Sequence, residues 1–154
     1  MNIEDRFWKN VDTSGDCWLW KLSLNHGGYG VFQVNPKLQV KAHRFAVECT
    51  QGQIPEGMQV DHKCHTPACV RPAHLRVVTH KQNMENLSGL ARNNTSGVRG
   101  VSWHKSTGKW RAEVSHFRKI IHVGLFDSIE AAADAVLAKR NELFTHNDMD
   151  RSAA

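Results

Sequence analysis

The feature that most constrains this chain is a group of metal-binding side chains within residues 61–74. Cys64, Cys69 and His74 follow the spacing Cys-x4-Cys-x4-His. Thiolates and an imidazole are ligands that tetrahedral zinc prefers, and a closed structural site needs a fourth, which Cys17 or Cys49 can supply. The segment contains little apolar material, so a zinc ion would explain how it holds a shape. The alternative is two buried free thiols beside a surface histidine.

The residues around this group predict two strands followed by a helix. Residues 58–62 alternate apolar and polar side chains, and residues 74–79 are β-branched, so each segment favours a strand. Thr79 lies three residues before Gln82, which is a capping-box spacing and predicts a helix from about His80 to Gly89. Upstream, the sequence predicts short strands at residues 17–20, 29–34 and 38–41, then a helix over 42–50.

Asp61 and His62 end the first strand of this predicted unit. A histidine near its ordinary pKa can take a proton from water at neutral pH. Asp61 is a hard oxygen ligand suited to magnesium, and Asn83 brings a second oxygen from the first turn of the helix. An Asp-His pair by itself is usually only surface polarity. Its position at a strand end, next to the cysteine group, favours a catalytic interpretation.

With these motifs, residues 7–90 resemble the ββα-metal (His-Me finger) nucleases, in particular the phage-type HNH homing endonucleases and the His-Cys box endonucleases. The resemblance rests on Asp61-His62, the cysteine–histidine loop, Asn83 and four upstream strings. These strings are Cys17-Trp18-Leu19-Trp20, Gly27-Gly28-Tyr29-Gly30, Ala42-His43-Arg44 and Gly52-Gln53-Ile54-Pro55-Glu56-Gly57.

The resemblance implies a role for each matched residue. His62 would be the general base, and Asp61 and Asn83 would hold one magnesium or manganese ion on the scissile phosphate. Arg44 would contact a phosphate, with a solvated arginine as the alternative. Structural zinc would be bound by Cys64, Cys69, His74 and, as the preferred fourth ligand, Cys17.

The chain departs from the family pattern at one position of the loop. Arg71 precedes Pro72, where the family usually has an asparagine that braces the loop. The departure bears on the loop geometry and not on the metal site. His65 and His80 are interpreted as loop or surface histidines, and Cys49 as a small core residue.

The second half of the chain predicts a separate small domain. Residues 92–97 are polar and rich in turn formers, so they predict a linker after a nuclease domain at 1–91. Residues 98–146 predict three strands, at 98–103, 110–116 and 120–126, and a helix over 129–144 capped by Asp127. Residues 147–154 are predicted to be a polar tail.

The charge of the chain is concentrated in this second half. The formal net charge is +5, and the sequence pI is about 9.2. Residues 92–124 carry seven basic side chains and one acid, Glu113, so the rest of the chain is close to neutral. Such a distribution favours a polyanionic partner, although a net charge of this size can also serve solubility alone.

One set of residues predicts a DNA-binding face on this domain. It comprises Arg99, Trp103, Lys105, Lys109, Trp110 and Arg111. Basic side chains neutralise phosphates and read guanine, and indoles pack on sugar or base. The alternative is that the two tryptophans are ordinary cross-strand partners.

Residues 96–144 resemble the APETALA (ethylene-response-factor) DNA-binding domain, whose three-stranded sheet lies in the major groove. The matching strings are Gly97-Val98-Arg99-Gly100-Val101, Trp110-Arg111-Ala112-Glu113-Val114, Val123-Gly124-Leu125-Phe126 and Glu130-Ala131-Ala132. Domains of this type also occur fused to phage HNH nucleases, so the two resemblances support each other.

The sequence therefore predicts an α+β protein: a ββα-metal nuclease with a zinc-stapled loop, then a small three-stranded antiparallel sheet plus one helix. The expected function is metal-dependent endonuclease cleavage of double-stranded DNA, of the free-standing phage homing type. The alternative is a non-enzymatic, zinc-containing DNA-binding regulator; an RNA target is a third possibility, against which groove recognition argues. The target sequence, the oligomeric state, and nicking as against double-strand cleavage stay open.

The N-terminal residues are polar and charged, unlike a signal peptide, and no apolar run is long enough to span a bilayer. We therefore expect a protein of the cytoplasm, that of the bacterial host if a phage encodes it, which is not secreted. No membrane partner and no small-molecule substrate are expected.

Overall fold

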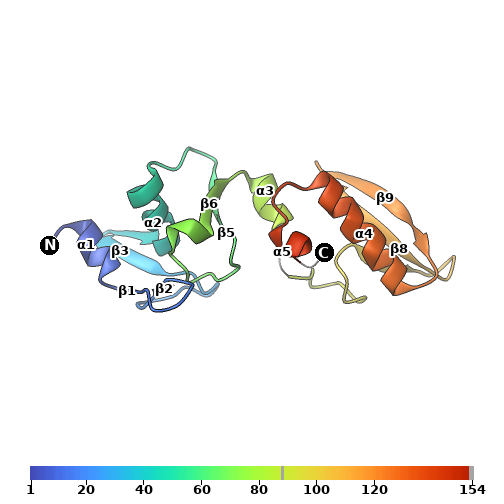
Figure 1. The fold of residues 1–154 in the computed structure, drawn as a ribbon, viewed down its shortest axis with the longest axis horizontal. Helices are drawn as coiled ribbons and strands as arrows, with labels where there is room; N and C mark the ends of the chain where they lie inside the picture. Colours follow the sequence, from blue (N-terminus) through green and yellow to red (C-terminus); the bar gives the residue numbers. More distant parts are fainter. Residues whose placement is uncertain (88, 153–154) are drawn as a thin grey trace. The chain divides into compact units, whose positions relative to one another are not determined.

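A computed structural model describes residues 1–87 and 89–152 (Figure 1). The chain divides into two compact units, Met1–Asn83 and Met84–Ala154. The predicted α+β class, built from small antiparallel sheets, is confirmed. The division lies upstream of the linker predicted at residues 92–97, which falls inside the second unit.

The first unit is built from three two-stranded antiparallel sheets and short helices. Its elements are α1 (Ile3–Trp8), β1 (Val11–Asp12), β2 (Leu19–Trp20), β3 (Val31–Asn35), β4 (Leu38–Lys41), α2 (Ala42–Gln51), β5 (Gln59–His62), the 3-10 turn η1 (Pro72–His74), β6 (Leu75–Val78) and α3 (His80–Glu85). The strands pair as β1 with β2, β3 with β4 and β5 with β6.

The core of this unit is an aromatic cluster around Phe7, which is fully buried on α1. Its ring stacks on Trp20 with centroids 5.0 Å apart and meets Phe32 edge-on at 5.1 Å. A Cβ on Gly30 would lie 2.7 Å from the Trp20 ring and 2.9 Å from Ala42 Cβ, so only glycine lets β3 begin here. The helix α1, which the sequence analysis did not predict, thus supplies the centre of the core.

Strands β5 and β6 and helix α3 form the predicted strand–strand–helix motif. The capping box is present, because Gln82 N donates to Thr79 Oγ1 and Thr79 N donates to Gln82 Oε1. The helix ends at Glu85, earlier than the predicted Gly89. The Arg99 guanidinium donates to the carbonyls of Met84, Glu85 and Leu87 at 3.1 Å, which satisfies the end of the helix. Ser88, within the predicted helix, lies outside the described residues.

The second unit is one sheet covered by one long helix. Its strands β7 (Val101–His104), β8 (Lys109–His116) and β9 (Lys119–Phe126) form an antiparallel sheet in that order, followed by α4 (Ile129–Leu143) and α5 (Asp148–Ser152). Figure 1 shows α4 lying across the sheet. The core between them consists of Val101, Ala112, Val114, Ala132, Val136 and Phe144.

Two predictions for this unit were wrong. Ser128, not Asp127, caps α4, because its side chain accepts a hydrogen bond from Ala131 N. The segment predicted as a polar tail begins with a buried Asn147 and forms α5. Arg140 of α4 explains why this segment is folded, because its Nε and Nη2 donate to the two carboxylate oxygens of Asp150 at 2.7 and 2.9 Å. Polar composition therefore did not mean a solvated segment.

The cap of α4 can be tested by a matched pair of substitutions. Ser128→Ala removes the acceptor for Ala131 N, so we expect it to lower the free energy of unfolding of the second unit by about 1 kcal/mol. Asp127→Ala should change little, because this exposed carboxylate pairs with the Lys109 amine at 3.0 Å and exposed ion pairs contribute little to stability. Urea denaturation measures both, and a larger loss for Asp127→Ala would contradict the assignment.

Candidate functional site

The four predicted zinc ligands come together in the first unit. One ligand atom each from Cys17, Cys64, Cys69 and His74 lies within 4.8 Å of the others. His74 Nδ1 is 3.6 Å from Cys17 Sγ and 3.7 Å from Cys69 Sγ. In tetrahedral zinc sites such ligand atoms are roughly 3.5–3.8 Å apart, since the metal bonds are about 2.0–2.3 Å long. The cluster can therefore hold zinc, and Cys17 is its fourth member; Cys49 lies on α2 and is not part of it.

The backbone explains how Cys17 reaches a loop some fifty residues away in sequence. Strand β2 and the cysteine loop pair directly, since Trp20 N donates to Ala68 O at 3.0 Å and Val70 N donates to Trp18 O at 2.8 Å. Burial raises the pKa of Cys69 to about 12. A thiolate at that position therefore needs a cation beside it, which fits a metal-binding role.

Arg71 replaces the loop brace that the family pattern would supply through asparagine. Its Nη1 donates to the Asp16 carbonyl at 2.7 Å and to Asp16 Oδ1 at 2.6 Å. Asp16 precedes Cys17, and its Oδ2 lies 3.6 Å from His74 Nε2. The arginine thus ties the segment carrying one ligand to the loop carrying the other three.

The geometry of His62 fixes which ring nitrogen can act as a base. His62 is buried, and its Nε2 lies 3.0 Å from the carbonyl oxygen of Cys69. A carbonyl oxygen only accepts, so Nε2 carries the proton and Nδ1 of the neutral ring carries the lone pair. Burial lowers the pKa of His62, which favours this neutral form.

Asp61 and Asn83 are each held by another side chain. Asp61 is buried, and its Oδ2 accepts from Arg76 Nε at 2.9 Å, with Arg76 Nη2 at 2.8 Å. Asn83 Nδ2 donates to Gln59 Oε1 at 2.7 Å. Gln59 and Asp61 are two residues apart on β5, so their side chains point to the same face of the strand. The amide of Asn83 and the carboxylate of Asp61 therefore share that face.

Two further residues beside His62 were missed as site residues. The His43 ring lies 4.8 Å from the His62 ring and 5.3 Å from Tyr29, centroid to centroid. Burial lowers the pKa of His43 to about 3, so it is neutral. Both lie in strings that carried the family resemblance, which was the available signal. Arg44, the next residue of α2, points its Nη1 toward the Met58 carbonyl at 3.5 Å.

In the second unit, the predicted DNA-binding residues do not share one face. Arg111 alternates with the core residues Ala112 and Val114 and lies on the face that α4 leaves uncovered, as does Lys109. Trp103 and Trp110 form a cross-strand pair with ring centroids 5.1 Å apart, and Trp110 packs against the α4-side core. The alternative of ordinary cross-strand partners therefore describes the tryptophans better. Lys105 is exposed on the β7–β8 turn.

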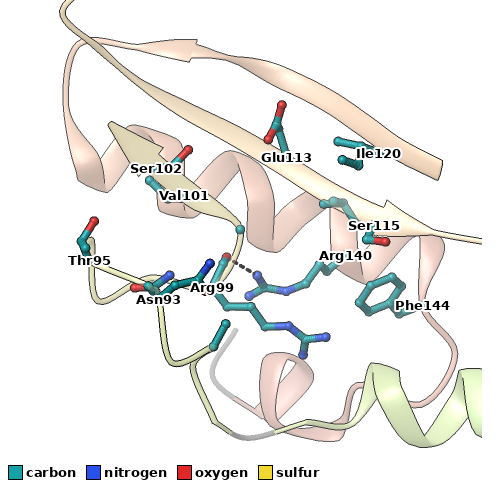
Figure 2. A pocket seen from close by; sticks show the side chains of 14 residues that line it. Asn93, Thr95, Arg99, Val101, Ser102, Glu113, Ser115, Ile120, Arg140 and Phe144 are labelled. Atoms are coloured by element: carbon teal, nitrogen blue, oxygen red, sulfur yellow. Dashed lines mark hydrogen bonds between the residues drawn. The ribbon is translucent and has the colours of Figure 1, made fainter. Parts of the chain in front are cut away.

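Arg99 is occupied within the second unit. Besides the three carbonyls around the end of α3, its guanidinium lies over the Phe144 ring at 5.8 Å. Figure 2 shows Arg99 and Arg140 beside a cavity of about 400 Å³, with Arg140 Nη1 donating to the Arg99 carbonyl at 2.7 Å. Both arginines are bound by protein groups. None of the predicted nuclease residues lines it.

Comparisons with known proteins match both halves of the chain. Residues 40–85 match the family model described as HNH endonuclease, and residues 96–142 match the AP2 domain. Protein 7.7 of Escherichia phage T7 is 42% identical over 72 residues, which are 47% of this chain and 55% of that protein. Protein 2.8 of the same phage is 34% identical over 94 residues, 60% of this chain and 64% of that protein.

The matches thus span 55% to 64% of the length of these curated relatives. No solved structure matches the chain. Among the described residues, none of the helices combines the length and the apolar character that crossing a membrane requires. The chain thus contains an HNH endonuclease domain matched over residues 40–85, followed by an AP2 domain matched over residues 96–142, in the order that the motifs predicted.

Proposed function

We propose that this chain is a metal-dependent endonuclease that hydrolyses a phosphodiester bond of double-stranded DNA. The HNH domain cuts, and the AP2 domain anchors it on the duplex. The observation that carries the proposal is the buried His62, whose Nε2 is bound to the Cys69 carbonyl. This leaves a neutral ring with Nδ1 as its basic atom, which is the state that a general base needs.

In the proposed reaction His62 Nδ1 removes a proton from a water molecule as the water oxygen attacks the phosphorus. The bond between phosphorus and the leaving sugar oxygen breaks, and that oxygen receives a proton from solvent. Asp61 and Asn83 would hold a magnesium or manganese ion, which when bound supplies a Lewis acid for the charge on the phosphate and the leaving oxygen. Arg44, on the helix that carries His43, would contact a phosphate.

The cysteine–histidine cluster would hold zinc in a structural role. Four protein ligands close a tetrahedral site and leave no open position for water, in contrast to catalytic zinc sites. Cys69 belongs to this cluster and also supplies the carbonyl that binds His62. The zinc would therefore act on catalysis only by holding the loop that fixes the base.

The face of the AP2 sheet opposite α4 is the proposed DNA-binding surface. Arg111 and Lys109 lie there, and the neighbouring positions are polar or ionisable at Glu113 and His122. This assignment keeps three of the predicted contacts, Arg111, Lys109 and the exposed Lys105 of the adjoining turn. It leaves out Arg99, Trp103 and Trp110. A basic sheet face of this kind fits the major groove.

The likeness to phage T7 proteins supports a phage source for the chain, and we propose that it is an endonuclease of the free-standing homing type. The HNH match favours an enzyme over a DNA-binding regulator, because a regulator needs neither a general base nor a catalytic metal. A monomer carries one His62 and would more naturally nick one strand, whereas a dimer would more naturally cut two.

His62→Ala tests the catalytic role. We expect plasmid cleavage in the presence of magnesium to fall by at least about 100-fold, because general-base catalysis commonly contributes this much. DNA affinity in a gel-shift assay should stay within about twofold, since the ring makes no phosphate contact. His26→Ala, which changes an exposed histidine of the same unit, is the control. Undiminished cleavage by His62→Ala would contradict the role of His62 as general base. If the wild type binds DNA but shows no metal-dependent cleavage, the alternative of a DNA-binding regulator is favoured.

Cys17→Ala and Cys49→Ala test the zinc site as a matched pair of thiol removals. Cys17→Ala should lose zinc and lower the melting temperature, because a structural zinc site contributes directly to folding free energy. Cys49→Ala should keep one zinc per chain. Elemental analysis and thermal unfolding check both, and a Cys17→Ala protein with full zinc and wild-type melting would rule Cys17 out as a ligand.

Arg111→Ala and Lys139→Ala test the DNA-binding face, since each removes one positive charge from the second unit. Each has an acidic partner: Arg111, on the uncovered sheet face, pairs with Glu113 at 3.3 Å, and Lys139, on α4, pairs with Glu142 at 2.9 Å. We expect Arg111→Ala to weaken DNA binding by about tenfold, the loss of roughly 1–3 kcal/mol typical of a base contact. Equal effects of both variants in fluorescence anisotropy would mean that only net charge matters.

A further inference from the structure

Gln59, at the start of β5, connects two residues of helix α3 through its side-chain amide. Its Oε1 accepts a hydrogen bond from Asn83 Nδ2 at 2.7 Å, and its Nε2 lies 3.2 Å from His80 Nδ1. Sequence analysis gave Gln59 no role and interpreted His80 as a surface histidine. In the structure the three side chains form one hydrogen-bonded row.

We propose that Gln59 is a positioning residue for the catalytic metal ligand Asn83. This inference rests on the proposed function, in which the Asn83 amide oxygen binds a divalent cation. A side-chain amide has a donor end and an acceptor end on opposite sides of one carbon. Because the donor end of Asn83 is bound to Gln59, its oxygen is turned away from Gln59. Without that bond the amide can rotate by half a turn and present its nitrogen, which binds no cation.

The orientation of Gln59 is itself set by His80. The Gln59 Nε2 can only donate, so it pairs with His80 Nδ1 acting as an acceptor, and Oε1 is left facing Asn83. His80 is the first residue of α3, the helix whose capping box fixes its start. The row therefore links His80, at the start of α3, through Gln59 of β5 to Asn83 of the same helix.

Gln59 also places Asn83 on the face of β5 that carries the second proposed ligand, Asp61. Gln59 and Asp61 point to the same face of β5, and Arg76, directly opposite Asp61 in β6, holds its carboxylate. Both oxygen ligands are thus held by neighbouring side chains on this hairpin. Loss of such an outer partner typically weakens metal binding by about 10- to 100-fold.

Two near-isosteric variants separate hydrogen bonding from packing. Gln59→Leu keeps the volume but removes the acceptor for Asn83 Nδ2, whereas Gln59→Glu keeps an oxygen acceptor there. The direct readout is Mn²⁺ binding to the full-length, zinc-loaded chain without DNA, followed by electron paramagnetic resonance. The second readout is the magnesium concentration that gives half-maximal plasmid cleavage. Zinc content and melting temperature establish that each variant is folded.

We expect Gln59→Leu to weaken Mn²⁺ binding about tenfold or more and to raise the half-maximal magnesium concentration in parallel, with DNA affinity unchanged. Gln59→Glu should bind Mn²⁺ at least as well as the wild type. Equal weakening by both variants, wild-type behaviour of Gln59→Leu, or failure of the wild-type chain to bind Mn²⁺ would each overturn the inference. The proposed function is tested separately, by whether cleavage by the wild-type chain needs magnesium and His62. If it does, the proposed function stands in all three cases. If it does not, the proposed function fails whatever Gln59 does.

Discussion

The cysteine loop of the first unit depends on the meeting of Cys17, Cys64, Cys69 and His74, because this loop has little apolar material of its own. The backbone pairing of residues 18–20 with residues 68–70 brings Cys17 to the other three ligands. Cys69 then has two functions: its thiol belongs to the cluster, and its carbonyl accepts from His62 Nε2. A cluster that can hold zinc is thus joined to the proposed catalytic base through one residue, so we propose that the loop sets the hydrogen bonding of the base.

The second unit reaches a stable core by a different route, with no cluster of metal-binding residues among its described residues. A helix covers one face of a three-stranded sheet, and two arginines extend the core with polar contacts. Arg99 satisfies carbonyls around the end of α3, and Arg140 binds Asp150 and the Arg99 carbonyl. Both arginines are therefore bound by protein groups. Arg111, which we propose as a DNA contact, lies on the uncovered face of the sheet and pairs with Glu113 at 3.3 Å.

Short-range patterns were predicted well from the sequence, and contacts between distant residues were not. The Thr79–Gln82 capping box, the strands flanking the cysteine loop and the long C-terminal helix follow from local spacing, and all are present. The spacing of the motif left Cys17 and Cys49 as alternative fourth zinc ligands, because only the pairing of β2 with the cysteine loop distinguishes them. Arg99 was predicted as a DNA contact because a basic residue on a predicted strand resembles a phosphate ligand; its carbonyl acceptors are visible only in the structure. Gln59 gave no signal, since its importance comes from two partners more than twenty residues away.

The central claim is that the closed cysteine loop holds His62 with its proton on Nε2. Nitrogen-15 NMR of the histidine side chains, with His62 assigned by comparison with His62→Ala, measures this directly in the zinc-loaded chain and after chelation. The account predicts a neutral His62 in the Nε2–H form with zinc bound, and a mixture of both neutral forms once zinc is removed. An Nδ1–H form in the zinc-loaded chain, or a spectrum of His62 that chelation leaves unchanged, would contradict it.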